Sequence, residues 1–142
     1  MIVIAFQWLI RLLAVVQITL GALFWTGNAF TLLPLHMLSG LLLVLSIWVL
    51  AGLALRSGVQ FGLPVLALVW GVLVIALGVT QDSLLTGDLH WIIQVLHLLV
   101  GLAAVGQAEG MARRTLSQLA ERQMKSDLRL EGSGATSPGA SR

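Results

Sequence analysis

The sequence predicts an all-α integral membrane protein, a four-helix bundle whose successive helices run up, down, up and down. Hydrophobic residues make up 58% of the 142 residues and charged residues only 10%, which is more apolar surface than a soluble domain of this size can bury. Nearly uncharged stretches of about 20 residues, enough to cross a hydrocarbon core of ~30 Å, recur along the chain. The alternation expected of a transmembrane β-barrel is absent from the sequence.

We expect the four spans at about 5–27, 35–55, 61–81 and 88–108, in a bundle domain of residues 1–109. The first begins MIVIAFQW, without the basic start or the small-residue cleavage site of a signal peptide, so it is expected to be a retained helix. The breaks are marked by turn-forming residues: Gly27-Asn28, Pro34, Arg56-Ser57-Gly58, Pro64 and Gln81-Asp82-Ser83. Connections this short are typical of helices that lie side by side.

Two segments follow the fourth span. Residues 110–130 place Leu116, Leu119, Met124 and Leu128 among charges, which predicts a helical extension, either cytoplasmic or in the interface with the inner headgroups. Residues 131–142, EGSGATSPGASR, have the composition of a disordered tail.

The distribution of positive charge predicts the orientation. Arg56 lies between the second and third spans and the basic cluster follows the fourth, whereas the other two connections contain no Lys or Arg. By the positive-inside rule both termini are cytoplasmic, and we expect the inner (cytoplasmic) membrane of a bacterium or archaeon. The net charge of +2 is sorted along the chain and forms no basic face, so no nucleic-acid partner is expected.

The sequence lacks the residues that several kinds of chemistry require. It contains no cysteine, which excludes disulfides, cysteine zinc sites and thiol catalysis. It also lacks a Ser-His-Asp set, a glycine-rich phosphate loop and paired carboxylates within the spans, so hydrolase and nucleotide-binding functions are not indicated.

Two histidines lie within the spans in matching motifs. His36 opens HMLSGLLLVL and His97, 61 positions later, opens HLLVGLAAVG, which suggests a duplicated helical hairpin. The second and fourth spans run in the same direction, so the two imidazoles are expected in the same outer half, where they can ligate a haem iron from opposite faces. Gly40 and Gly101, one helical turn further on, would leave room for the macrocycle. The alternative is a pair of buried imidazoles that are hydrogen-bonded to neighbouring helices.

The third histidine has several possible roles, and two charged residues lie near the inner ends of the spans. His90 shares a helix face with His97 and is a second ligand, a proton acceptor, a partner for a haem propionate, or an ordinary interfacial residue. Arg11 is expected to extend to the inner interface, and Glu109 to pair with Arg113 on the same helix.

Two segments carry a family resemblance. VQITLGALFWTGNAFTLLPLHMLSGLLL (16–43) and LHWIIQVLHLLVGLAA (89–104) resemble the first hairpin and the fourth helix of one four-helix half of the heme A synthase family. The resemblance implies that His36 and His97, on the second and fourth helices, clasp a haem, and that a two-half arrangement needs a homodimer. The family's outer-loop glutamate has no counterpart in GNAFTLLP. The resemblance therefore implies haem binding more strongly than haem oxidation.

The resulting hypothesis is a cytochrome-like protein of the lipid bilayer that binds haem b through His36 and His97 and acts in electron transfer, with an unknown redox partner, or in haem handling. One alternative is a cofactor-free membrane scaffold or small transporter subunit. Another is a heme A synthase-like enzyme that acts as a homodimer.

Overall fold

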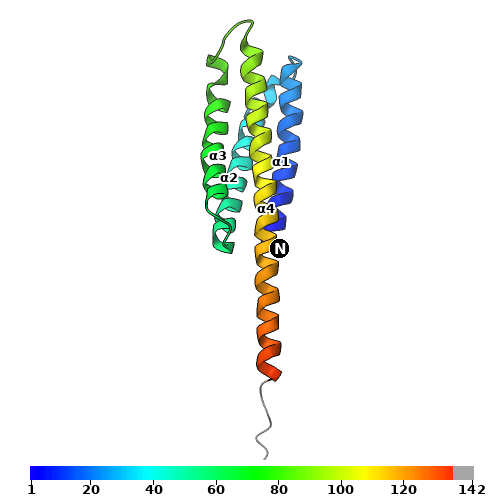
Figure 1. The fold of residues 1–142 in the computed structure, drawn as a ribbon. Helices are drawn as coiled ribbons and strands as arrows, with labels where there is room; N and C mark the ends of the chain where they lie inside the picture. Colours follow the sequence, from blue (N-terminus) through cyan, green and yellow to red (C-terminus); the bar gives the residue numbers. More distant parts are fainter. Residues whose placement is uncertain (136–142) are drawn as a thin grey trace, which may run out of the picture.

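The structure, a computed structural model, describes residues 1–135, and these residues form a bundle of helices (Figure 1). The elements are α1 (Ile2–Trp25), η1 (Phe30–Leu32), α2 (Leu33–Ser57), α3 (Gly62–Thr80), η2 (Gln81–Ser83) and α4 (His90–Ala135). No β-strand occurs in the described range. Each of the four α-helices is long and apolar enough to cross a membrane, so the expected all-helical class with four spans is confirmed.

The helices form two hairpins, α1–α2 and α3–α4. The connections within both hairpins lie at one end of the bundle, here called the loop end (Figure 1). The turn between α2 and α3 and the N-terminus lie toward the other end, from which α4 projects; this is the tail end. Neighbouring helices pack in chain order, α4 packs on α1, and α2 also contacts α4 across the bundle.

Local sequence explains where the helices begin and end. Pro34 lies in the first turn of α2 and Pro64 in the first turn of α3, where a missing backbone N–H costs no helical hydrogen bond. Gly58 ends α2 with φ of 90°, a left-handed conformation that glycine adopts without strain. These residues keep the hairpin connections short.

The packed core lies mainly in the tail half. Its fully buried side chains include Ile10 of α1, Ile47 and Leu50 of α2, and Met111 of α4. Most other large apolar side chains point outward on all four helices and are exposed. Such a surface suits a hydrocarbon solvent, in which helices associate through close contact of small residues and through packing.

The predicted boundary of the bundle at residue 109 is too early. Helix α4 continues unbroken, and Met111, Ala112 and Thr115 are each no more than 1% exposed, so the first turns of the expected extension belong to the core. The helix continues to Ala135, which makes residues 131–135 helical where a disordered tail was expected. Extending an existing helix needs no new nucleus, which explains why composition placed its end too early. Residues 136–142 of that tail lie outside the described range.

Glu109 pairs with Arg11 of α1, not with Arg113 as expected. Arg11 Nε lies 2.6 Å from Glu109 Oε1, and Arg11 Nη2 donates to Oε2 at 2.9 Å. Gln7 donates to the same Oε2 at 2.7 Å. The carboxylate thus accepts three hydrogen bonds from α1, which joins α1 to α4 in the tail half.

A close contact between α2 and α3 gives a first prediction. A Cβ added to Gly71 would collide with the Trp48 indole nitrogen and lie 2.9 Å from Val44 Cγ1, whereas one added to Gly52 would meet nothing within 4 Å. We expect Gly71→Ala to lower the free energy of unfolding by about 1–3 kcal/mol through overpacking. Gly52→Ala, the matched control, should lose nothing. Equilibrium unfolding in detergent micelles measures both, and equal stability of the two variants would refute the contact.

Candidate functional site

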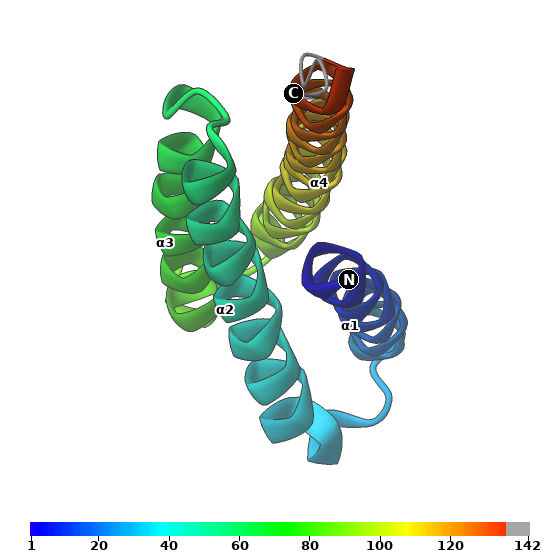
Figure 2. The ribbon, with the colours of Figure 1, turned by 90° about the horizontal axis from the view of Figure 1, so that it is seen from below.

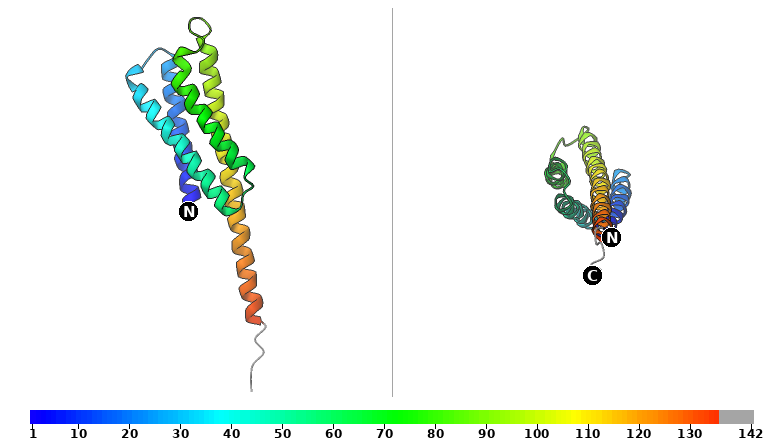
Figure 3. Two further views of the ribbon diagram at one scale, coloured as in Figure 1. Left: turned by 90° about the vertical axis from the view of Figure 1, so that its left-hand side faces the viewer. Right: turned by 60° about the horizontal axis from the view of Figure 1, so that its bottom comes forward.

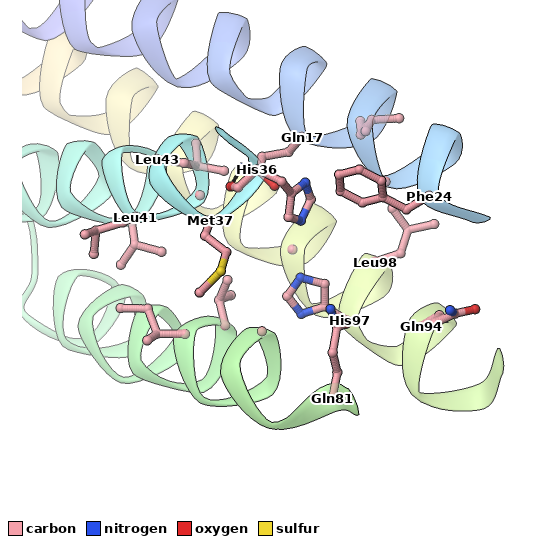
Figure 4. A pocket seen from close by; sticks show the side chains of 18 of the residues that line it. Gln17, Phe24, His36, Met37, Leu41, Leu43, Gln81, Gln94, His97 and Leu98 are labelled. Atoms are coloured by element: carbon pink, nitrogen blue, oxygen red, sulfur yellow. Dashed lines mark hydrogen bonds between the residues drawn. The ribbon is translucent and has the colours of Figure 1, made fainter. Parts of the chain in front are cut away.

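The loop half contains a partly open cavity of about 580 Å³ that is lined by residues of all four helices. This volume lies within the ~300–1,000 Å³ typical of small-molecule and cofactor pockets. The lining is mainly aliphatic, and its polar members include Gln17 of α1, His36 of α2 and His97 of α4 (Figure 4). The cavity therefore suits a largely apolar ligand that is held at a few polar points.

The inclination of α2 makes room for the cavity. Seen from below, α2 leans across the bundle, with its C-terminal half beside α3 and its N-terminal half standing away from it (Figure 2). The side view likewise shows α2 inclined to α1 (Figure 3). The contact of Gly71 with Trp48 holds the two helices together on the tail side of the cavity. The cavity is thus a slot between the two hairpins.

His36 is held by two residues of α1. Gln17 Nε2 donates to the His36 carbonyl at 2.7 Å and to Ser39 Oγ at 2.8 Å. The Phe24 ring meets the His36 imidazole edge to face, with ring centroids 5.3 Å apart. These contacts fix the turn of α2 that carries the imidazole.

Gly40 lines the cavity, but the group closest to it is the side chain of Gln17. A Cβ added there would lie 3.0 Å from Gln17 Nε2, so the absence of a side chain at Gly40 allows Gln17 to reach α2. The expected role of Gly40, room for a macrocycle, is therefore not needed to explain this glycine.

Gly101 and Gly78 leave space around His97. A Cβ added to Gly101 would meet nothing within 4 Å, so it would enter the cavity. A Cβ added to Gly78 of α3 would lie 3.3 Å from His97 Cε1. Gly78 could not be predicted as a site residue from the sequence, because one glycine in an apolar span looks like any other packing residue.

The two imidazoles face each other across the slot (Figure 4). The Nδ1 atoms of His36 and His97 are buried and have no hydrogen-bond partner within residues 1–135. Their Nε2 atoms are not among the buried ones and accept or donate no hydrogen bond within the same range, so they are the nitrogens open to the cavity. The alternative in which both imidazoles are hydrogen-bonded to neighbouring helices is therefore not found. Leaving such groups unsatisfied in an apolar site costs about 1–3 kcal/mol each.

His90 lies apart from this pair. It does not line the main cavity but borders a smaller hollow of about 150 Å³ at the loop end, with Asp82 and Gln94. Its Nδ1 lies 3.3 Å from the Leu84 carbonyl oxygen, within hydrogen-bond distance. The structure thus brings His36 and His97 together and leaves His90 at the loop-end rim of the cavity, here called the mouth, where Gln81, Asp82 and Gln94 line both hollows.

The side chains available as metal ligands decide which kind of metal or metal cofactor fits the cavity. No group of three or more His, Cys, Asp or Glu side chains within the described chain is placed to hold a metal ion. Two opposed imidazoles instead suit a metal that arrives with its own equatorial ligands, as iron does in a porphyrin.

The Gln17 contact gives a second prediction. We expect Gln17→Leu to remove the hydrogen bonds between α1 and α2 and to lower the unfolding free energy by about 0.6–1.7 kcal/mol, the usual range for such bonds in membranes. Thr19→Val is the control, because the Thr19 hydroxyl bonds only to Val15 of its own helix. Unfolding titrations in detergent measure both variants, and a Gln17→Leu protein as stable as the control would rule out the clamp.

No family model, no curated protein and no solved structure matches this chain. The resemblance to the heme A synthase family stays a prediction that rests on the residues quoted for it.

Proposed function

We propose that the chain is a membrane-embedded haem b protein in which His36 and His97 are the axial ligands of one haem. The observation that carries the proposal is the pair of imidazoles that face each other across an apolar slot, with Nδ1 atoms that have no hydrogen-bond partner within residues 1–135. Neutral imidazole is a good haem ligand, and a low-spin haem takes one on each face. The Nε2 atoms face the cavity and carry no hydrogen bond within residues 1–135, so they are the nitrogens free to bind a metal.

The other residues of the slot fit a flat, apolar group. Gly101 leaves open space next to His97, and apolar side chains of all four helices, such as Leu43 and Val44 of α2, close the slot against water. Gln17 and Phe24 orient His36, and Gly78 leaves room for the His97 ring. A haem held in this way supplies one-electron transfer, and the apolar walls keep solvent from the metal.

The orientation in the membrane is part of the proposal. Both termini and the projecting part of α4 lie in the cytoplasm, the helices run up, down, up and down, and the loop end faces outward in a bacterial or archaeal inner membrane. The support is the absence of Lys and Arg from 12–55 and from 57–112, which leaves both loop-end connections without positive charge. His90 is then the only basic side chain near the mouth within the described chain, where haem propionates would emerge.

The absorption spectrum tests the function. We expect the detergent-purified protein from haem-replete cells to show a sharp Soret band and split α/β bands of low-spin haem. His36→Ala and His97→Ala should each abolish the low-spin spectrum, because each removes one axial ligand. His90→Ala should keep it, since His90 lies outside the slot. A colourless protein, or one whose spectrum survives the loss of His97, would refute the proposed ligand pair.

Gly101 gives a test that leaves both histidines in place. Gly101→Leu should fill the cavity and lower haem affinity by at least about tenfold, the effect of roughly 1.4 kcal/mol of lost fit. Gly106→Leu is the matched control, because Gly106 lies on the same helix, has open space around it and does not line the cavity. Haem titration of the apoproteins in detergent compares the two, and equal affinities would show that the ligand does not use this space.

A further inference from the structure

The slot is closed wherever two helices of the same hairpin meet. Between α1 and α2, Gln17 bonds to the His36 carbonyl and Phe24 packs on the imidazole. Between α3 and α4, the Trp70 indole donates to the Val100 carbonyl at 2.9 Å, and Gly78 lies against His97. A ligand cannot pass through these two walls without breaking the contacts that shape the site.

The two seams between the hairpins differ in the size of their side chains. On the α2–α3 side, Met37 reaches from α2 toward α3, and Val79 adds a second large apolar group (Figure 4). On the α1–α4 side the cavity wall contains Gly21, Ala22 and Gly101 beside the larger Ile18 and Leu102, whereas on the α2–α3 side Gly78 lies beside Met37 and Val79. Cβ atoms added to Gly21 and Gly101 would meet nothing within 4 Å. The α1–α4 seam therefore presents more small residues to a flat ring than the α2–α3 seam, where Met37 extends into the gap left by the inclination of α2.

This opening, which we call the α1–α4 window, is bounded by Ile18, Gly21 and Ala22 of α1 and by Gly101 and Leu102 of α4. Ile18 is 46% exposed and Leu102 45% exposed, so the cavity wall at the window is also part of the outer, apolar surface. Toward the tail end the same seam is closed by the bonds of Arg11 to Glu109. The window thus opens sideways, at the level of the spans, onto the hydrocarbon phase.

We propose that haem enters and leaves the slot sideways from the lipid through the α1–α4 window, an inference that rests on the proposed haem site. The direct route to water is less suited to the macrocycle, since the loop-end mouth is bordered by Gln81, Asp82 and Gln94. A largely apolar ring would have to pass these polar groups, whereas at the window it exchanges one apolar environment for another.

The unpaired Nδ1 atoms of the two histidines favour exchange of haem over permanent binding. A ligating imidazole almost always donates its other N–H to an acceptor, and loss of such a partner typically costs about 10–100-fold in metal affinity. The Nδ1 atoms of His36 and His97 both lack an acceptor within residues 1–135. The site therefore binds haem in a form that lipid can take back, which assigns the chain to haem handling.

The kinetics of loading test the window. Apoprotein is reconstituted into phosphatidylcholine vesicles, haemin is added to the lipid, and growth of the low-spin Soret band gives the uptake rate; excess apomyoglobin then gives the rate of loss. Ala22→Trp should slow both uptake and loss by about tenfold or more, because it raises the barrier at the window, whereas a lower affinity alone would speed the loss. Leu23→Trp is the control, because Leu23 is next to Ala22 but does not line the cavity, and it should match the unmodified protein.

A second form of the experiment avoids a large substitution during folding. The chain has no cysteine, so Ala22→Cys can be loaded with haem and then labelled with a bulky maleimide, with Leu23→Cys as the control. Slower haem loss only after labelling at position 22 supports the window. Unchanged rates in both forms, or slowing by Asp82→Trp alone, overturn the window and favour the loop end. If the unmodified protein takes up no haem, the proposed function itself fails, which is a separate outcome.

Discussion

An imidazole at the level of the hydrocarbon needs a partner, and residues 1–135 provide none for the Nδ1 atoms of His36 and His97. The helices nevertheless position both residues: Gln17 bonds to the His36 carbonyl, Phe24 packs on the His36 ring, and α3 lies close to the His97 ring at Gly78. Two positioned imidazoles with unpaired nitrogens, facing each other across an apolar slot, are the constraint on which the proposed haem site depends.

The two ends of the bundle differ in packing: the tail half holds the helices together and the loop half contains the cavity. In the tail half, Gly71 lets α2 and α3 touch, Met111 fills the centre, and Glu109 ties α4 to Arg11. Because these contacts hold the hairpins together at one end, the hairpins can stand apart at the other without losing the fold. The same arrangement closes the α1–α4 seam on the tail side of the site through Arg11 and Glu109, while Gly21 and Gly101 leave space beside the site.

The sequence predicted much of the fold, since spans, turns and the pairing of His36 with His97 follow from length, composition and helical phase. It could not predict contacts between helices. Glu109 has a basic residue one turn away on its own helix, yet it pairs across the bundle with Arg11, because the packing of α1 on α4 brings these side chains together. Gly40 likewise looked like space for a ligand but accommodates Gln17. Composition also placed the end of α4 too early, since helix continuation depends on the turns that precede it.

The account depends most on iron bound by two histidines at one site per chain. Titration of the apoprotein with haemin, followed by electron paramagnetic resonance, tests this directly because the signal reports both the spin state and the axial ligands. The account predicts saturation at one haem per chain with a low-spin ferric signal of two imidazole ligands. Binding that never saturates, or a signal that stays high-spin at saturation, would contradict it.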